Sequence, residues 1–297
     1  MKEKWALALC AVSLCGAVMA EPFPNSYSKR EAGDVDIWPE GRIPSVQTNQ
    51  CVPWIRWYVP QEVRTDACLI VCPGGGYSGW GHTSEGEEIC AWANSLGMTA
   101  VLFRYRTPRP IGLDKHVTAW QDAQRTIRLV RAAAKEKGFS PENIGFIGFS
   151  AGGHLTLMSA LSSQTPAYAP VDEIDRLPCH LNWAVPVYPA YVLSDGYDCG
   201  NTTKGNDLSL DIAPEFAFDA GTPKKFIFFH GDEDQYSPMA SLRIYNRLRT
   251  MGVSSEVHIV ATRGHCFHFY PKPKAGTFSA KWLETLGAWL RQTEIVK

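Results

Sequence analysis

The stretch Ile144-Gly-Phe-Ile-Gly-Phe-Ser-Ala-Gly-Gly-His154 decides how this 297-residue chain is interpreted. Its apolar run is typical of a buried strand, and the segment from Leu155 to Leu161 favours a helix. Between them Gly-x-Ser-x-Gly is centred on Ser150, a spacing found where a sharp strand-to-helix turn presents a nucleophilic hydroxyl above the edge of a sheet. We expect the strand and the helix to pass so closely that side chains larger than hydrogen at positions 148 and 152 would collide.

Composition indicates an ordinary soluble globular protein, with 45% hydrophobic and 20% charged residues. The formal net charge of -1 gives no sign of a nucleic-acid or anionic-membrane partner. The length suits one large α/β domain, which we place at residues 51–297.

The N-terminal residues 1–20 are predicted to be a signal peptide. Lys2 and Lys4 precede a short apolar run that ends in Val18-Met19-Ala20, with cleavage expected after about Ala20. The run is shorter than the ~20 residues that span a bilayer, so no membrane anchor is expected. The mature protein is therefore expected to be secreted or periplasmic, beginning with an extended arm at residues 21–50 that is rich in turn-forming residues.

Export permits disulfides, and the chain has nine cysteines. Removal of Cys10 and Cys15 with the signal peptide leaves seven, so at least one thiol stays unpaired within the chain. Cys179 and Cys199 flank a loop-rich insertion near residues 189–223 and are the one pairing that we suggest. A loop of that length inside a compact domain is usually functional.

From residue 67 onward, apolar strand patterns alternate with helical ones, which predicts a mostly parallel central sheet with helices on both faces. An alternating segment before it, Val52 to Pro60, reads as an antiparallel strand near a sheet edge. Ligands of such sheets bind at the carboxyl ends of the strands. The predicted strands are 67–72, 99–105, 144–149, 181–188, 225–230 and 256–260, and the predicted helices are 85–95, 116–137, 155–161, 238–251 and 279–292.

Ser150 needs a base, because a serine hydroxyl is a poor nucleophile until its proton is removed. Of eight histidines, His265 is the best placed, a few residues after the last strand, although a loop histidine without such a role is the alternative. The histidine in turn needs an acid to orient it. We favour Asp234, at the middle of an acidic loop, and expect Asp232 and Glu233 to form a solvated turn.

A charge that develops on a substrate carbonyl oxygen needs backbone N–H donors. Ala151, directly after Ser150, can supply one, and Gly75 and Gly76, in the loop after the strand ending at Cys72, can supply others. A phosphate-binding loop is the rival interpretation of the glycines, but no Gly-Lys-Ser/Thr follows them.

His265 and His268, with Cys266 between them, could suggest a metal pair. A metal site normally needs three or four ligands, and no further ligand clusters with them in sequence. No metal and no cofactor are therefore predicted.

Taken together, these residues resemble the secreted carbohydrate acetylesterases related to acetylxylan esterases, which belong to the α/β-hydrolase superfamily. The resemblance runs from about Val52 to Leu290. It departs at Pro73, where related esterases carry histidine, and at the short, polar insertion. The motifs that carry it are Pro73-Gly-Gly-Gly-Tyr77, Ser84-Glu85-Gly86, Tyr105-Arg106, Asp122-Ala-Gln-Arg125, Gly148-Phe-Ser-Ala-Gly-Gly-His154, His230-Gly-x-x-Asp234 and Gly264-His265-x-Phe267.

The resemblance implies the α/β-hydrolase fold, a Ser150–Asp234–His265 triad, and removal of acetyl groups from polysaccharides or oligosaccharides such as acetylated xylan. The alternatives are a peptidase, a lipase or a general carboxylesterase on the same scaffold, and, in another class, a non-catalytic carbohydrate-binding relative. Tyr77 and Trp80 follow the glycine loop and are our candidates for substrate contact, whereas Asp122 and Arg125 are expected to form a structural ion pair.

Overall fold

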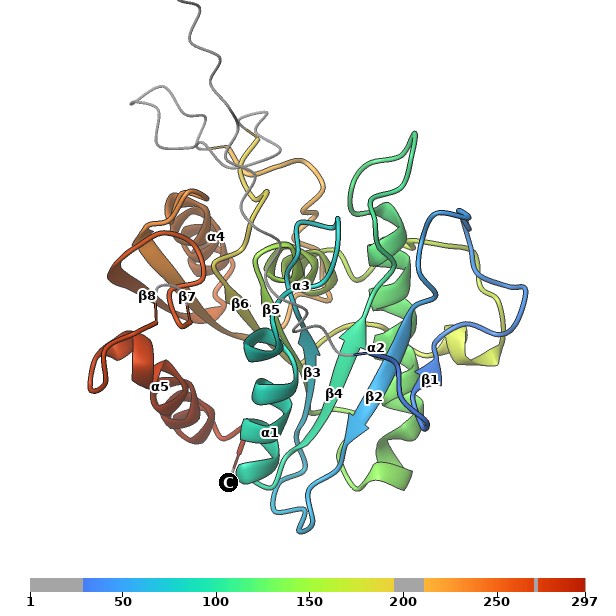
Figure 1. Cartoon of the computed structure of the whole chain (residues 1–297), viewed down its shortest axis with the longest axis horizontal. Helices are drawn as coiled ribbons and strands as arrows, with labels where there is room; N and C mark the ends of the chain where they lie inside the picture. Colours follow the sequence, from blue (N-terminus) through green and yellow to red (C-terminus); the bar gives the residue numbers. More distant parts are fainter. Residues whose placement is uncertain (1–28, 195–210, 270–271, 297) are drawn as a thin grey trace, which may run out of the picture.

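The apolar segments form one eight-stranded sheet in a computed structural model that describes residues 29–194, 211–269 and 272–296 (Figure 1). The strand order is β1-β2-β4-β3-β5-β6-β7-β8. The strands are β1 Val35–Asp36, β2 Trp54–Tyr58, β3 Cys68–Cys72, β4 Thr99–Arg104, β5 Ile144–Phe149, β6 Trp183–Val187, β7 Lys225–Glu233 and β8 Ser254–Arg263.

The sheet is parallel from β4 to β8 and antiparallel where β2 pairs with β4 and β1. Strand β5 lies at its centre, between β3 and β6, and all six of its residues are buried. Such a strand reads as a continuous apolar run because helices cover both of its faces. The mostly parallel α/β sheet predicted from the sequence is confirmed, including the antiparallel strand near its edge.

In the described part of the chain, five α-helices cover the two faces of the sheet (Figure 1). One hydrophobic core joins the sheet to α1 and α5, and a second joins it to α2, α3 and α4. Among the described residues, no helix combines the length and the apolar character that a bilayer crossing requires. The helices are α1 Glu87–Ser95, α2 Val117–Lys137, α3 Ala151–Leu161, α4 Met239–Thr250 and α5 Phe278–Gln292, with short 3₁₀ helices at Thr83–Glu85 and Glu173–Arg176.

The N-terminal arm is fastened to the domain by buried groups. Trp38, 5% exposed, donates its indole N–H to the Asp122 carboxylate at 2.7 Å. Asp122 also pairs with Arg106 at 2.8 Å, while Arg125 binds Asp172 at 2.6 Å. The predicted Asp122–Arg125 ion pair is therefore wrong, because each of the two side chains has a partner from another segment.

The two described ends of the insertion lie side by side, and an antiparallel bridge joins Leu193 to Ile212. Cys179 carries a free thiol that donates to the carbonyl oxygen of Ser163 at 3.3 Å. The expected disulfide is therefore not present at Cys179, and Cys199 lies outside the described residues, as does the predicted signal peptide.

Candidate active site

Ser150 sits at the corner between β5 and α3, with φ of 54° and ψ of -116°. This backbone conformation is costly for a residue with a side chain. The corner is tight, because a Cβ at Gly148 would lie 2.1 Å from the Gly152 carbonyl oxygen, and one at Gly152 would lie 2.2 Å from that of Cys72. The expectation that both positions must be glycine is confirmed by these distances.

Ser150, His265 and Asp234 meet above the carboxyl ends of three strands. Ser150 Oγ lies 2.7 Å from His265 Nε2, and His265 Nδ1 lies 2.7 Å from Asp234 Oδ2. The serine follows β5, the aspartate follows β7 and the histidine follows β8. Residues separated by up to 115 positions thus form one hydrogen-bonded chain from hydroxyl to carboxylate.

Asp234 is buried, at 1% exposed, whereas the neighbouring Asp232 and Glu233 are exposed. The Asp234 carboxylate also accepts the backbone N–H of Tyr236 at 2.8 Å. His230 lies 3.6 Å from the same carboxylate, and burial lowers the pKa of His230 to about 4, so that it is neutral at physiological pH. Of the two described histidines beside Asp234, His265 is therefore the one that can become its cationic partner on accepting a proton.

The glycine loop after β3 faces Ser150. Gly75 has φ of 110°, a conformation that is available to glycine at little cost. Within the described chain, the backbone N–H groups of Gly75 and Gly76 and of Ala151, the first residue of α3, have no protein acceptor. Arg109 donates to the Gly76 carbonyl at 3.0 Å and fixes the outer side of this loop.

Glu85 is a buried carboxylate, 3% exposed, that joins the glycine loop to the sheet. Its Oε2 accepts the Gly74 N–H at 2.9 Å, and its Oε1 accepts the Tyr188 hydroxyl at 2.8 Å. Burial raises the pKa of Glu85. Sequence spacing gives no signal for this link, because Glu85 and Tyr188 are separated by 103 positions and belong to different elements.

A cavity of about 250 Å³ opens over Ser150. Trp80 lines it, as expected, but Tyr77 does not: the Tyr77 side chain is 1% exposed, and its hydroxyl is hydrogen-bonded to His154 Nδ1 at 2.8 Å. The loop turns this ring into the core. The cavity is lined by Gly75, Gly76, Trp80, Gly81, His82, Glu85, Ser150, Gln235, Tyr236, His265, Cys266 and Phe269.

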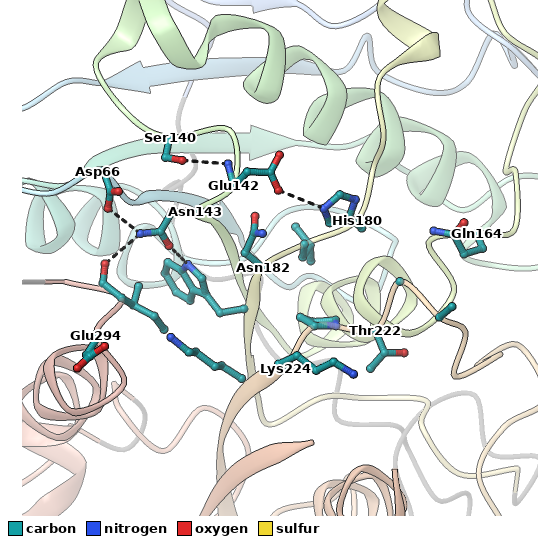
Figure 2. A pocket seen from close by; sticks show the side chains of 17 residues that line it. Asp66, Ser140, Glu142, Asn143, Gln164, His180, Asn182, Thr222, Lys224 and Glu294 are labelled. Carbon is teal, nitrogen blue, oxygen red and sulfur yellow. Dashed lines mark hydrogen bonds and ion pairs between the residues drawn. The ribbon is translucent and has the colours of Figure 1, made fainter. Parts of the chain in front are cut away.

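A larger cavity, of about 840 Å³, lies at the opposite end of the sheet, where β5, β6 and β7 begin (Figure 2). The polar groups at its wall bind one another, since Asn143 donates to Asp66 at 2.9 Å and accepts from the Trp183 indole at 3.0 Å. Its lining includes Ser140, whose Oγ accepts the Glu142 N–H at 3.1 Å, and His180, whose Nε2 lies 3.8 Å from the Glu142 carboxylate.

The sequence of this chain is similar to those of known ester hydrolases. The BD-FAE family model matches residues 56–182. An acetylxylan esterase of Xylanibacter ruminicola is 26% identical over 246 residues, which is 77% of this chain and 46% of that protein. The probable carboxylic ester hydrolase LipM of Mycobacterium tuberculosis is 27% identical over 60% of this chain and 44% of its own length. The chain thus spans about half the length of these two relatives.

Solved structures share the architecture. An acetyl ester-xyloside bifunctional hydrolase from Caldicellulosiruptor lactoaceticus superposes with a TM-score of 0.73 at 25% identity, over 89% of this chain and 97% of that one. The esterase Est2 of Thermogutta terrifontis has a TM-score of 0.65 at 22% identity, over 83% and 91% of the two chains. The chain therefore has the α/β-hydrolase fold and is similar in sequence to an acetylxylan esterase.

Proposed function

We propose that this protein is a secreted serine esterase that removes acetyl groups from polysaccharides or oligosaccharides. The observation that carries the proposal is the contact of 2.7 Å between Ser150 Oγ and His265 Nε2, within a cavity and backed by buried Asp234. A nucleophile, a base within hydrogen-bond reach and a third group that orients the base form the arrangement of a serine hydrolase.

In this mechanism Ser150 Oγ attacks the acyl carbonyl carbon while His265 Nε2 takes the hydroxyl proton. Asp234 keeps the remaining ring hydrogen on Nδ1 and stabilises the imidazolium. The N–H groups of Gly75, Gly76 and Ala151 donate to the oxygen that becomes negative. His265 then protonates the departing sugar oxygen, which leaves as a hydroxyl group. Water, activated by the same imidazole, then releases acetate from Ser150.

The size of the cavity favours a short acyl group. Its volume of about 250 Å³ is below the roughly 300–1,000 Å³ of pockets that hold drug-sized ligands. Trp80, Tyr236 and Phe269 are aromatic side chains on its wall that could contact a sugar ring. The similarity to an acetylxylan esterase and to an acetyl ester-xyloside hydrolase supports acetylated carbohydrate as the substrate class.

Acetate release from a panel of acetylated polysaccharides tests the proposal, together with a series of simple esters of increasing acyl length. We expect acetate from at least one polysaccharide. We also expect a kcat/KM that falls from acetyl esters to esters of acids with eight or more carbons, because the cavity is small. Preference for long acyl chains, or cleavage of peptides in place of esters, would refute the assignment to an acetylesterase.

Glu85 is a positioning residue in this scheme, and Glu85→Ala should lower kcat by about 10- to 100-fold with little change in KM. Removal of one oxyanion donor costs about 10²–10³ in kcat, and Glu85 acts on those donors only through the Gly74 N–H. Steady-state kinetics on a soluble acetyl ester provide the measurement.

Glu85→Gln serves as the matched control, since its amide oxygen can still accept the Gly74 N–H and its NH₂ can donate to the Tyr188 oxygen. We expect this variant to keep kcat within a few-fold of the native enzyme. A loss in Glu85→Gln as deep as in Glu85→Ala would contradict a positioning role and indicate that the carboxylate handles a proton.

A further inference from the structure

Three potential metal ligands gather beside the nucleophile helix without a part in the chemistry described above. They are His116, which precedes α2, His154 in α3, and Glu215 from the described C-terminal part of the insertion. One ligand atom of each lies within 4.8 Å of the other two, and His154 Nε2 lies 3.2 Å from Glu215 Oε1. Their separation along the chain explains why no sequence motif reveals the group.

Within the described residues, His116 has a buried ring nitrogen without a hydrogen-bond partner. His116 is 8% exposed, and its Nδ1 makes no hydrogen bond to any described residue. A buried polar atom without a hydrogen-bond partner costs free energy, so such an atom needs an explanation. A bound ion is one such explanation. The His116 ring lies 5.6 Å from the His154 ring, centroid to centroid.

The charge state of the group suits a cation. Burial lowers the pKa of His116 to about 4 and also lowers that of His154, so both imidazoles are neutral at physiological pH. Glu215 supplies a carboxylate, with Oε1 at 3.2 Å from His154 Nε2. The group therefore presents two neutral imidazoles and one carboxylate, which are the protonation states in which these side chains bind metals.

Tyr77 lies where a partner to a ligating histidine is normally found. Its buried hydroxyl is 2.8 Å from His154 Nδ1. If Nδ1 carries the ring hydrogen and donates it to Tyr77, then the lone pair of Nε2 is free to bind a metal. A metal-bound histidine almost always donates its second N–H in this way.

The distances are close to those of a tetrahedral site. Ligand atoms about 2.0–2.2 Å from a zinc ion stand roughly 3.3–3.6 Å from one another. The His154–Glu215 pair is already at 3.2 Å, and the other pairs, within 4.8 Å, require movements of about 1 Å. Two imidazoles and a carboxylate favour zinc over calcium or magnesium, which prefer oxygen ligands.

We propose that His116, His154 and Glu215 bind a zinc ion, with water as the fourth ligand, and that the ion fastens the insertion to α3. The insertion already contacts this helix next to the proposed site, where the Ser162 hydroxyl donates to the Glu215 carbonyl at 3.0 Å. The ion would join α3, which follows Ser150 directly, to the start of α2 and to the insertion.

The proposal can be tested by adding zinc chloride to the metal-stripped full chain. Two quantities are measured: the number of zinc ions bound per chain and the melting temperature. We expect one equivalent of zinc per chain and a rise in Tm of roughly 5 °C at a hundredfold excess over Kd. His116→Gln and Glu215→Gln should each lose this binding and the rise in Tm, measured from the variant's own metal-free Tm. Tyr77→Phe should keep the stoichiometry but bind about 10- to 100-fold more weakly.

Two further variants locate the ion. His180→Gln removes an imidazole that also faces a glutamate, Glu142 at 3.8 Å, and should bind zinc like the native chain. His265→Gln should also bind one equivalent of zinc per chain. Absence of stoichiometric binding to the native chain would overturn the proposal. Binding that persists in His116→Gln and Glu215→Gln but is lost in His265→Gln would overturn it equally, since the ion would then occupy the Ser150 site.

Discussion

Ser150→Ala should lower kcat for a small acetyl ester by a factor on the order of 10⁶, because loss of the nucleophile removes the covalent pathway. The fold should be retained, since the hydroxyl makes its one described side-chain contact with His265. Steady-state kinetics and far-UV circular dichroism measure the two properties. Activity near the native level in this variant would contradict the mechanism.

Ser150→Gly is a matched companion that separates the strain at this corner from the chemistry. It should be as inactive as Ser150→Ala but more stable than it by about 1–2 kcal/mol, because a φ of 54° is costly for alanine and not for glycine. Urea unfolding of the two variants measures the difference. Equal stability would mean that the backbone relaxes when the serine is removed.

Gly152→Ala should destabilise the protein by more than about 4 kcal/mol or prevent folding. Alanine normally stabilises a helix relative to glycine by about 1 kcal/mol, so propensity alone predicts the opposite sign. The added Cβ would, however, lie 2.2 Å from the carbonyl oxygen of Cys72, a backbone atom of a central strand. Losses above 4 kcal/mol are rare for single substitutions and here indicate a clash between α3 and β3. Soluble yield and urea unfolding provide the measurement.

Gly79→Ala is the control for that substitution, because a Cβ at position 79 would meet no atom within 4 Å. Its free energy of unfolding should stay within about 0.5 kcal/mol of the native value. If both variants were equally stable, then the corner at Ser150 would not be as tight as these distances indicate.

The sheet and the Ser150 corner could be predicted from the sequence because their signals are local. A six-residue apolar run followed by small residues and a helical segment fixes β5, Ser150 and α3 within one short stretch. The alternation of strand and helix patterns along the chain likewise predicts the parallel sheet. His265 and Asp234 follow from the topology, since both come directly after strands that end at the same edge.

The other features of the site could not be predicted, because they depend on contacts between segments that are distant in sequence. Tyr77 follows the glycine loop in sequence, yet the loop directs its ring into the core toward His154. Glu85 and His116 look like surface residues of helical segments until tertiary packing buries them. A local pattern reports which residue types are present, but it does not report which way a loop turns.

The central claim, that Ser150 is an acyl-accepting nucleophile, is tested most directly by the intact mass of the protein after reaction with a fluorophosphonate. We predict one covalent adduct per chain, mapped to Ser150 by peptide mass analysis, with loss of esterase activity in proportion to labelling and no adduct in Ser150→Ala. An unlabelled protein, as expected of a non-catalytic carbohydrate-binding relative, or an adduct on a different residue that tracks the loss of activity, would contradict the account.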